Sequence, residues 1–143
     1  MAEPFPDLTV QPFVEDRRAQ LIELWHRCGL TVAANSPNED INRKIAFQPE
    51  LLLIALLNNQ LVGTVMVGYE GHRGWIQYLG VDPDFQRRGV GGLLLEAAES
   101  KLRALGCPKI NLQIRAGNEA VVRFYERHGY SIEERFNMGR RLR

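Results

Sequence analysis

The sequence lacks the features that mark a disulfide-stabilised or metal-binding protein. Only two of the 143 residues are cysteines, Cys28 and Cys107, and they lie 79 positions apart with no CxxC pair and no neighbour at metal-ligand spacing. Histidine, aspartate and glutamate form no cluster with metal-ligand spacing either. We therefore expect two idle thiols in a reducing compartment, and no metal.

Long apolar runs are also missing. The longest unbroken run, residues 51–57, is far shorter than the roughly 20 residues that a membrane-spanning helix needs. The chain starts Met-Ala-Glu-Pro, without the basic start and apolar stretch of a secretory signal. These absences predict a cytoplasmic protein with no membrane partner.

Neither positive nor negative charge is in clear excess. Lysine and arginine number 18 against 17 acidic residues, which leaves a formal net charge of +1. Non-specific nucleic-acid binding depends on a clear excess of positive charge, so no nucleic-acid partner is expected. A chain of this length, 45% hydrophobic, corresponds to a single domain over residues 1–143 with a core that needs no disulfides.

What the sequence does contain is a hydrophobic periodicity that alternates between strand and helix. The pattern predicts an α/β fold of about six strands and four helices in the order β-α-α-β-β-β-α-β-α-β. Asp16 and Asn118 are the expected N-caps of the first and last helices, and Gly29, Gly106 and Gly129 are expected stops. The strands are predicted at residues 8–12, 51–57, 61–69, 75–81, 110–114 and 130 to about 141, and the helices at 16–28, 40–47, 91–105 and 119–128.

The connections between these elements predict a mixed sheet. Short turns join the strands at 51–57, 61–69 and 75–81, so these three are expected to be antiparallel. A full helix separates the strands at 75–81 and 110–114, which can then be parallel neighbours through a right-handed crossover.

The segment most indicative of chemistry follows the strand that ends at Val81. Residues 82–92 read Asp-Pro-Asp-Phe-Gln-Arg-Arg-Gly-Val-Gly-Gly and lead into a helix. Glycine lets the backbone approach a ligand closely, and the amides of a first helical turn point at whatever lies there. The positive end of the helix dipole and the side chains of Arg87 and Arg88 favour an anion, so the segment predicts a phosphate site.

Two common phosphate motifs do not fit this segment. The P-loop pattern GxxxxGK[ST] is absent, and Leu94 occupies the third glycine position of the Rossmann pattern GxGxxG. The remaining alternative without a ligand is a tight turn shaped by its glycines, which would gain nothing from two adjacent arginines.

The loop instead resembles that of a known family. Residues 86–91, Gln-Arg-Arg-Gly-Val-Gly, are similar to the [QR]xxGx[GA] pyrophosphate loop of the GNAT superfamily of acetyl-CoA-dependent N-acetyltransferases. Residues 118–130 resemble the NxxAxxxYxxxGF segment of that superfamily, in the expected order. The resemblance extends from about residue 8 to residue 142. Within the superfamily, residues 63–66, 68–74 and 106–110 look most like the small bacterial YpeA-type acetyltransferases, and RimI is a more distant relative.

The resemblance implies a site for acetyl-CoA. It implies a sheet splayed between its fourth and fifth strands, where the pantetheine arm pairs with Leu79, Gly80 and Val81 as if it were an added strand. Asn118 would bind the pantetheine or fix the adjacent loop, and a plain N-cap is its alternative role. The pyrophosphate would be held by the amides of Arg87, Arg88, Gly89, Val90, Gly91 and Gly92.

The resemblance also implies a catalytic acid but supplies no catalytic base. Tyr125 would protonate the leaving CoA thiolate, which suits a phenol, although a buried packing role is its alternative. RimI-like enzymes carry a glutamate base where this chain has Gln113, which cannot accept a proton near neutral pH. Glu70 and His72, in the turn after the third strand, are the weak candidates for this role, together with a water relayed from a backbone carbonyl.

The implied activity is transfer of an acetyl group from acetyl-CoA to a primary amine, by direct attack in a ternary complex. One alternative is a non-catalytic CoA- or acyl-CoA-binding module that acts as a sensor or structural subunit, and another is a nucleotide-binding regulator. The acceptor amine, on a small molecule, peptide or protein, is expected to bind against the first two helices or a partner subunit of a homodimer. The reason is that only 13 residues follow Tyr130, fewer than a closing seventh strand needs.

Overall fold

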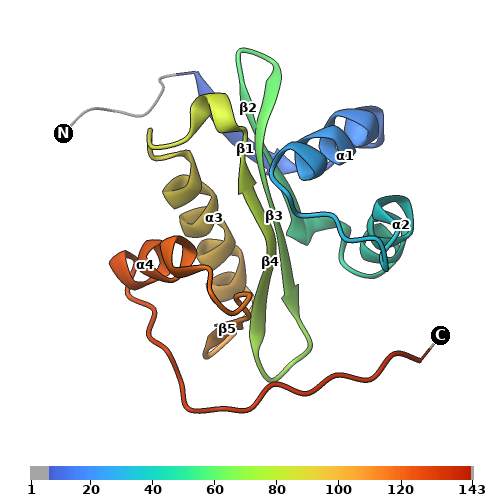
Figure 1. The fold of residues 1–143 in the computed structure, drawn as a ribbon. Helices are drawn as coiled ribbons and strands as arrows, with labels where there is room; N and C mark the ends of the chain where they lie inside the picture. The colour runs from blue at the N-terminus through green and yellow to red at the C-terminus, as the bar shows by residue number, and fades with distance from the viewer. Residues whose placement is uncertain (1–6, 143) are drawn as a thin grey trace. The chain divides into compact units, whose positions relative to one another are not determined.

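The computed structural model describes residues 7–142 of the chain (Figure 1). The chain divides into two compact units between Leu112 and Gln113, and each unit is described by itself. Within residues 7–142, the first contains five strands and three α-helices, and the second contains one α-helix. None of the helices within 7–142 has the length and apolar character to cross a bilayer.

A five-stranded sheet forms the centre of the first unit. Its spatial order follows the sequence, and its strands are β1 (Leu8–Pro12), β2 (Leu52–Leu57), β3 (Gln60–Tyr69), β4 (Gly74–Val81) and β5 (Ile110–Leu112). β1 to β4 pair with one another in antiparallel fashion, and β4 and β5 are parallel. The antiparallel pairing of β2, β3 and β4 and the parallel pair were predicted. Asn58 and Asn59 both adopt positive φ, at 48° and 67°, as the tight turn of a two-residue hairpin requires.

Three helices cover the two faces of this sheet. Figure 1 shows α3 (Val90–Ala104) on one face, and α1 (Arg18–Arg27) and α2 (Pro37–Phe47) on the other. Because both faces are covered, β2 is buried along nearly its whole length, which explains its continuous apolar run.

The predicted N-cap of the first helix is wrong. Asp16 lies inside a short 3₁₀ turn over Glu15–Arg17, and α1 starts directly after it at Arg18, with Arg17 at the N-cap position and no side-chain cap. The predicted stop is confirmed, since Gly29 follows the helix with a φ of 68°.

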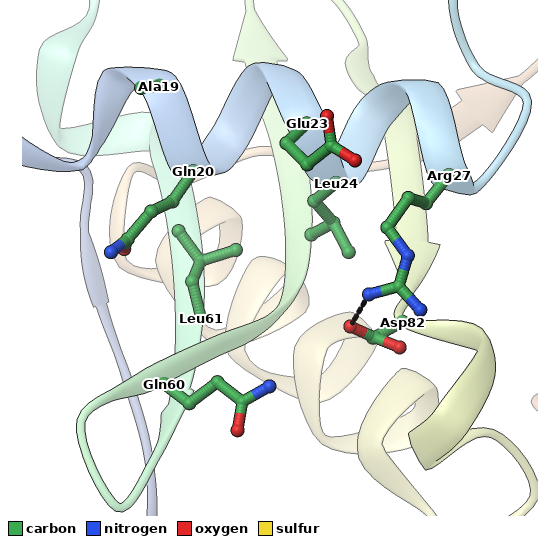
Figure 2. Close-up of a pocket in the computed structure, with 8 residues that line it drawn as sticks. All are labelled: Ala19, Gln20, Glu23, Leu24, Arg27, Gln60, Leu61 and Asp82. Carbon is green, nitrogen blue, oxygen red and sulfur yellow. Dashed lines mark hydrogen bonds and ion pairs between the residues drawn. The ribbon is translucent and has the colours of Figure 1, made fainter.

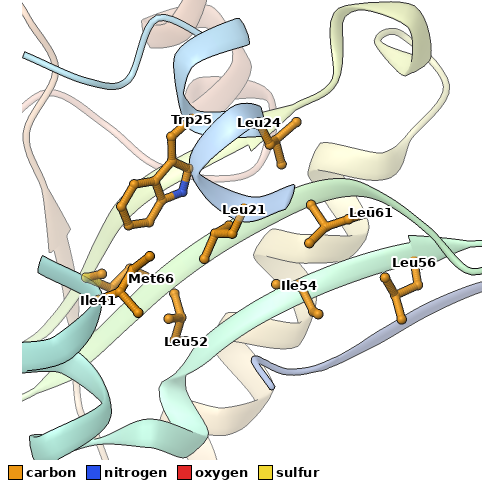
Figure 3. Close-up of a cluster of buried hydrophobic side chains, with 9 residues drawn as sticks. All are labelled: Leu21, Leu24, Trp25, Ile41, Leu52, Ile54, Leu56, Leu61 and Met66. Carbon is orange, nitrogen blue, oxygen red and sulfur yellow. The ribbon is translucent and has the colours of Figure 1, made fainter. Parts of the chain in front are cut away.

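One cluster of the core lies between α1, α2 and the sheet (Figure 3). Trp25 and Leu21 of α1 and Ile41 of α2 are fully buried there against side chains of β2 and β3. Each buried side chain of this size contributes roughly 1.5–3 kcal/mol relative to exposure. This packing holds α1 and α2 against the sheet, close to the strand that leads into the glycine-rich loop.

The fourth and fifth strands separate early, as the sequence resemblance implied. Pairing with β5 is confined to the first three residues of β4, at Gly74–Ile110, Trp75–Asn111 and Ile76–Leu112. β4 then runs on to Val81 without β5 beside it. Residues 77–81 therefore present one backbone edge that the sheet does not use.

The predicted sixth strand is not present. In the second unit, α4 (Glu119–Arg127) is followed by residues 130–142, which adopt no strand structure. Ile132, Phe136 and Met138 alternate as a strand would require, yet they are 77%, 100% and 91% exposed. A strand also needs the hydrogen bonds of a neighbour, and periodicity alone does not supply one.

Candidate functional site: the loop between β4 and α3

The loop that joins β4 to α3 has the backbone geometry of an anion site. Arg87 and Gly89 both adopt left-handed conformations, with φ of 65° and 86°, and Gly89 is the N-cap of α3. A left-handed residue next to ordinary ones turns successive amides towards one concave side. Such a nest binds anions through the backbone itself.

The start of α3 is open to an anion. The first hydrogen bond of the helix runs from the amide of Leu93 to the carbonyl of Gly89, at 3.1 Å, so the three preceding helical amides have no acceptor within the helix. No side chain caps α3, and its first turn has no acidic residue. By contrast, α2 is capped by Ser36 and carries two acidic residues in its first turn. The residues present here fit a pyrophosphate.

A buried carboxylate anchors the beginning of the loop. Asp82 is only 2% exposed. One of its oxygens accepts from the amide of Asp84 at 2.9 Å, and the other accepts from the guanidinium of Arg27 at 2.5 Å. Sequence reasoning missed both anchoring residues. The Asp-Pro-Asp turn is a signal for Asp82, but nothing in the sequence points to Arg27, which lies on α1.

The open edge of β4 carries the backbone groups of Val81. The amide of Asp82 donates to the carbonyl of Val62 at 2.8 Å, so Gly63 and Val81 form a non-hydrogen-bonded pair. In such a pair the backbone N–H and C=O of Val81 point away from β3. They lie at the edge where β5 no longer pairs, which is where the sequence predicted contact with the pantetheine arm.

Two side chains already reach this edge. Cys28 donates its thiol to the carbonyl of Val81 at 3.3 Å, and Gln86 donates its amide to the same oxygen at 3.1 Å. Burial is the main cause that raises the pKa of Cys28, so it remains a thiol that positions the backbone. Gln86, the first residue of the loop motif, ties the loop to the end of β4.

Gly80 is required for packing. A Cβ at this position would come 2.8 Å from Cδ1 of Leu30 and 3.1 Å from Sγ of Cys28. The glycine therefore lets the segment after α1 lie directly on β4.

Glu70 and His72, the two side chains considered as bases, lie at the opposite end of β4. The carboxylate of Glu70 accepts from the backbone amides of His72 and Arg73, both at 2.6 Å, and these bonds lower its pKa. With about 3.3 Å per strand residue, the eight residues of β4 separate this turn from the loop by roughly 25 Å. Glu70 is thus part of a turn and a weaker base than a free carboxylate.

The other two residues of the sequence motifs belong to the second unit. Asn118 is the N-cap residue of α4, but its side chain makes no capping hydrogen bond, contrary to the expected cap. Tyr125 is buried, with its ring edge-on to Phe124 and Tyr130 at centroid distances of 5.1 Å and 5.4 Å. Burial raises the pKa of Tyr125 to about 12.

A hollow of about 360 Å³ lies beside the anchor of the loop (Figure 2). Figure 2 shows Arg27 and Asp82 paired on one side of it, with Glu23 on α1 and Gln60 at the start of β3 nearby. Its lining includes none of the site residues that the sequence predicted. Among residues 7–142, no three His, Cys, Asp or Glu side chains are arranged to hold a metal ion.

Comparison with known proteins agrees with this geometry. The sequence pattern of the Acetyltransferase (GNAT) family matches residues 11–130. The chain belongs to the GNAT family. An acetyltransferase of Pectobacterium atrosepticum is 44% identical over 135 residues, which cover 94% of this chain and 96% of the relative. The family and the enzyme class that the two motifs predicted, an N-acetyltransferase with acetyl-CoA as donor, are confirmed.

Solved structures show the same GNAT fold. PaiA N-acetyltransferase from Thermoplasma acidophilum, in complex with coenzyme A, has a TM-score of 0.79 at 18% identity, covering 90% of this chain and 92% of that one. Ard1 from Thermoplasma volcanium has a TM-score of 0.78 at 23% identity, covering 89% and 84%. The expected GNAT-like α/β architecture is confirmed, with five strands instead of about six.

Proposed function

We propose that this GNAT enzyme acetylates a primary amine by direct attack of the amine on the thioester of acetyl-CoA, in a ternary complex. The observation that carries the proposal is the combination of an uncapped helix start, which suits a pyrophosphate, with the unused edge of β4 beside it. A pyrophosphate joined to an extended arm with amide groups is the chemistry that these two features fit together.

In this proposal the donor is held almost wholly by backbone. The amides of residues 87–92 bind the pyrophosphate, and Arg87 and Arg88, both exposed, add positive charge. The backbone of Leu79 and Val81 pairs with the pantetheine arm, and Asn118, whose side chain caps nothing, is a further partner for that arm. The N–H of Val81, at the open edge, is proposed to polarise the thioester carbonyl.

The chemical step needs positioning and two proton transfers, with no enzyme nucleophile. The amine nitrogen forms a bond to the carbonyl carbon, and the bond between that carbon and sulfur then breaks. The departing thiolate takes a proton from the phenol of Tyr125. The ammonium proton leaves to a base, for which a water relayed from a backbone carbonyl suits this chain better than Glu70 or His72, given where their turn lies.

We propose a small-molecule, peptide or protein amine that binds on the side of the first two helices, with a homodimer as the alternative source of missing contacts. The whole chain, residues 1–143, would act as one N-acetyltransferase domain.

A non-catalytic CoA-binding module is the second candidate, and Gln113 is the observation that favours it. The position of the glutamate base in RimI-like enzymes is held by an amide, which here donates to the side chain of Asn137. Such a module would bind acetyl-CoA and transfer nothing.

The deciding experiment follows release of the free CoA thiol from acetyl-CoA in the presence of amine acceptors. Small amines, amino acids, aminoglycosides and peptides with free N-termini form the panel, and reactions without acceptor measure background hydrolysis. We expect one acceptor class to give saturable thiol release together with an acetylated product. Saturable acetyl-CoA binding with no transfer to any acceptor would favour the module, and tighter binding of ATP than of CoA would favour a nucleotide regulator.

A further inference from the structure

Tyr78, in the middle of β4, has an unusual backbone conformation. Its φ is 53°, in the left-handed region that a bulky aromatic residue rarely occupies. The residue lies at an irregularity in the pairing of β4 with β3. A strained conformation of this kind persists only where the surroundings enforce it, and such residues gather at functional sites.

The surroundings enforce it from both helices on that face of the sheet. The ring of Tyr78 stacks on Trp25 of α1, with centroids 4.0 Å apart and planes 10° from parallel. The hydroxyl of Tyr78 donates to Asp40 of α2 at 2.5 Å, and Arg43 donates to the other oxygen of the same carboxylate at 2.5 Å. Tyr78 is therefore held at its face and at its tip.

The burial of Trp25 supports a dedicated role for the stack. Trp25 is fully buried, and its Nε1 has no hydrogen-bond partner within residues 7–142. An unpaired buried donor is unfavourable, and no hydrogen bond from the described residues orients the indole, so packing, including the stack on Tyr78, holds it in place.

The bulge at Tyr78 changes which backbone groups face the open edge. Gln77 pairs with Met66 before the bulge, and Gly80 pairs with Thr64 after it, so β4 has one extra residue at this point. Without that residue, Gly80 would stand opposite Gly63, and a shift of one position reverses the direction of every group. The N–H and C=O of Val81 would then point towards β3.

From this arrangement we infer that Tyr78, locked by Trp25 and Asp40, is a positioning residue that turns the backbone of Leu79 and Val81 towards the acetyl-pantetheine arm. The inference rests on the proposed function for the identity of that arm. It makes α1 and α2 responsible for affinity towards the arm, while the loop at the start of α3 is responsible for affinity towards the pyrophosphate. The two contributions are separable, because different residues supply them.

The test compares two ligands on the full chain by titration calorimetry. Acetyl-CoA carries both the pyrophosphate and the arm, whereas ADP carries adenosine and the pyrophosphate without the arm. Tyr78→Phe keeps the stack and removes the bond to Asp40, Asp40→Asn leaves Tyr78 intact, and Tyr78→Leu removes both the stack and the bond. Tyr69→Phe is the matched control, since it removes a tyrosine hydroxyl, bonded to the carbonyl of Gly71, at the far end of the same sheet.

We expect Tyr78→Phe and Asp40→Asn each to weaken acetyl-CoA binding roughly tenfold, as for loss of one hydrogen bond to a charged group, with ADP affinity changed less than twofold. Tyr78→Leu should weaken acetyl-CoA binding further than Tyr78→Phe, because the conservative change preserves the stack. In turnover assays the loss should appear as a raised KM for acetyl-CoA with kcat less affected. Tyr69→Phe should match the wild type with both ligands.

Two results would overturn the inference: wild-type acetyl-CoA affinity in folded Tyr78→Phe and Asp40→Asn, or equal losses for acetyl-CoA and ADP, which would mark a general loss of structure. Failure of the proposed function gives a different result. If the wild-type chain binds acetyl-CoA but acetylates no acceptor, the proposed activity is wrong, and the acetyl-CoA and ADP affinities of the variants still decide the role of Tyr78. A wild-type chain that binds no acetyl-CoA overturns both.

Discussion

Among single residues, Tyr125 has the chemistry that the motifs predict most specifically. Its raised pKa, about 12 because of burial, means that the phenol keeps its proton throughout the neutral range. A group that must donate a proton has to be protonated when the C–S bond breaks. Burial therefore secures the acid form and, at the same time, makes the phenol a weaker acid than one in water.

Replacing Tyr125 by phenylalanine separates binding from chemistry. We expect kcat to fall roughly 10- to 1000-fold, with acetyl-CoA affinity changed by less than about threefold, because in the proposed mechanism the hydroxyl acts only as the bond to sulfur breaks. Single-turnover rates of wild type and Tyr125→Phe measure the step without interference from product release. Equal rates in that format would assign Tyr125 to packing and the proton to solvent.

The pH profile of the wild type provides the control for this assignment. A raised pKa keeps the acid form present above pH 10, where an ordinary tyrosine would lose it, so the alkaline decline in rate due to Tyr125 should lie towards pH 12. A decline centred near pH 10 and absent from Tyr125→Phe would contradict a buried acid.

The sequence could predict candidate site residues that lie next to one another in the chain, but not pairs of residues that lie far apart in it. The loop at residues 86–92 was predictable because its glycines and arginines are contiguous and each has a physical reason. The partners that fix the loop and the bulge are not contiguous, since Arg27 and Asp82 are 55 positions apart and Asp40 and Tyr78 are 38 positions apart. A single sequence contains no signal for such pairs, since each depends on how α1 and α2 pack on the sheet.

At the scale of elements, the hydrophobic periodicity and the turn residues predicted most of the strands and helices. They failed where a strand also needed a neighbouring strand to pair with. The hairpins and the parallel crossover followed from connection lengths, and the splay of β4 from β5 followed from the family resemblance. The strand predicted from residue 130 has the correct alternation but no pairing partner in the structure. The start of α1 was predicted too early because Asp16, a good cap by residue type, lies within a 3₁₀ turn.

The loop and α3 together allow a substitution experiment with an internal control. Gly89 and Gly106 lie at opposite ends of α3, and both have left-handed backbones, with φ of 86° and 80°. Valine at either position forces a β-branched residue into that conformation, so both variants should lose comparable stability, on the order of 1–3 kcal/mol. Only Gly89→Val also places a side chain where the pyrophosphate is expected.

We therefore expect Gly89→Val to weaken acetyl-CoA binding at least tenfold and Gly106→Val to bind as the wild type does. Calorimetric titration of both variants, below the temperature at which either unfolds, gives the comparison. Unchanged affinity in folded Gly89→Val would mean that the phosphate binds elsewhere, and equal losses in both variants would mean that backbone strain alone is responsible.

For the whole molecule, the prediction concerns cooperativity, because the chain divides structurally at residue 112 and is proposed to function as one domain. If residues 1–143 unfold together, scanning calorimetry should give one transition with equal calorimetric and van't Hoff enthalpies.

Acetyl-CoA binds only the native state, so at one hundred times its Kd it should stabilise that state by about 2.7 kcal/mol and raise Tm by roughly 5–10 °C. ADP at the same multiple of its own Kd is the control, since mass action predicts the same shift. Two transitions, of which acetyl-CoA moves only one, would show that the parts before and after residue 112 fold independently, and no shift at millimolar acetyl-CoA would contradict the donor assignment itself.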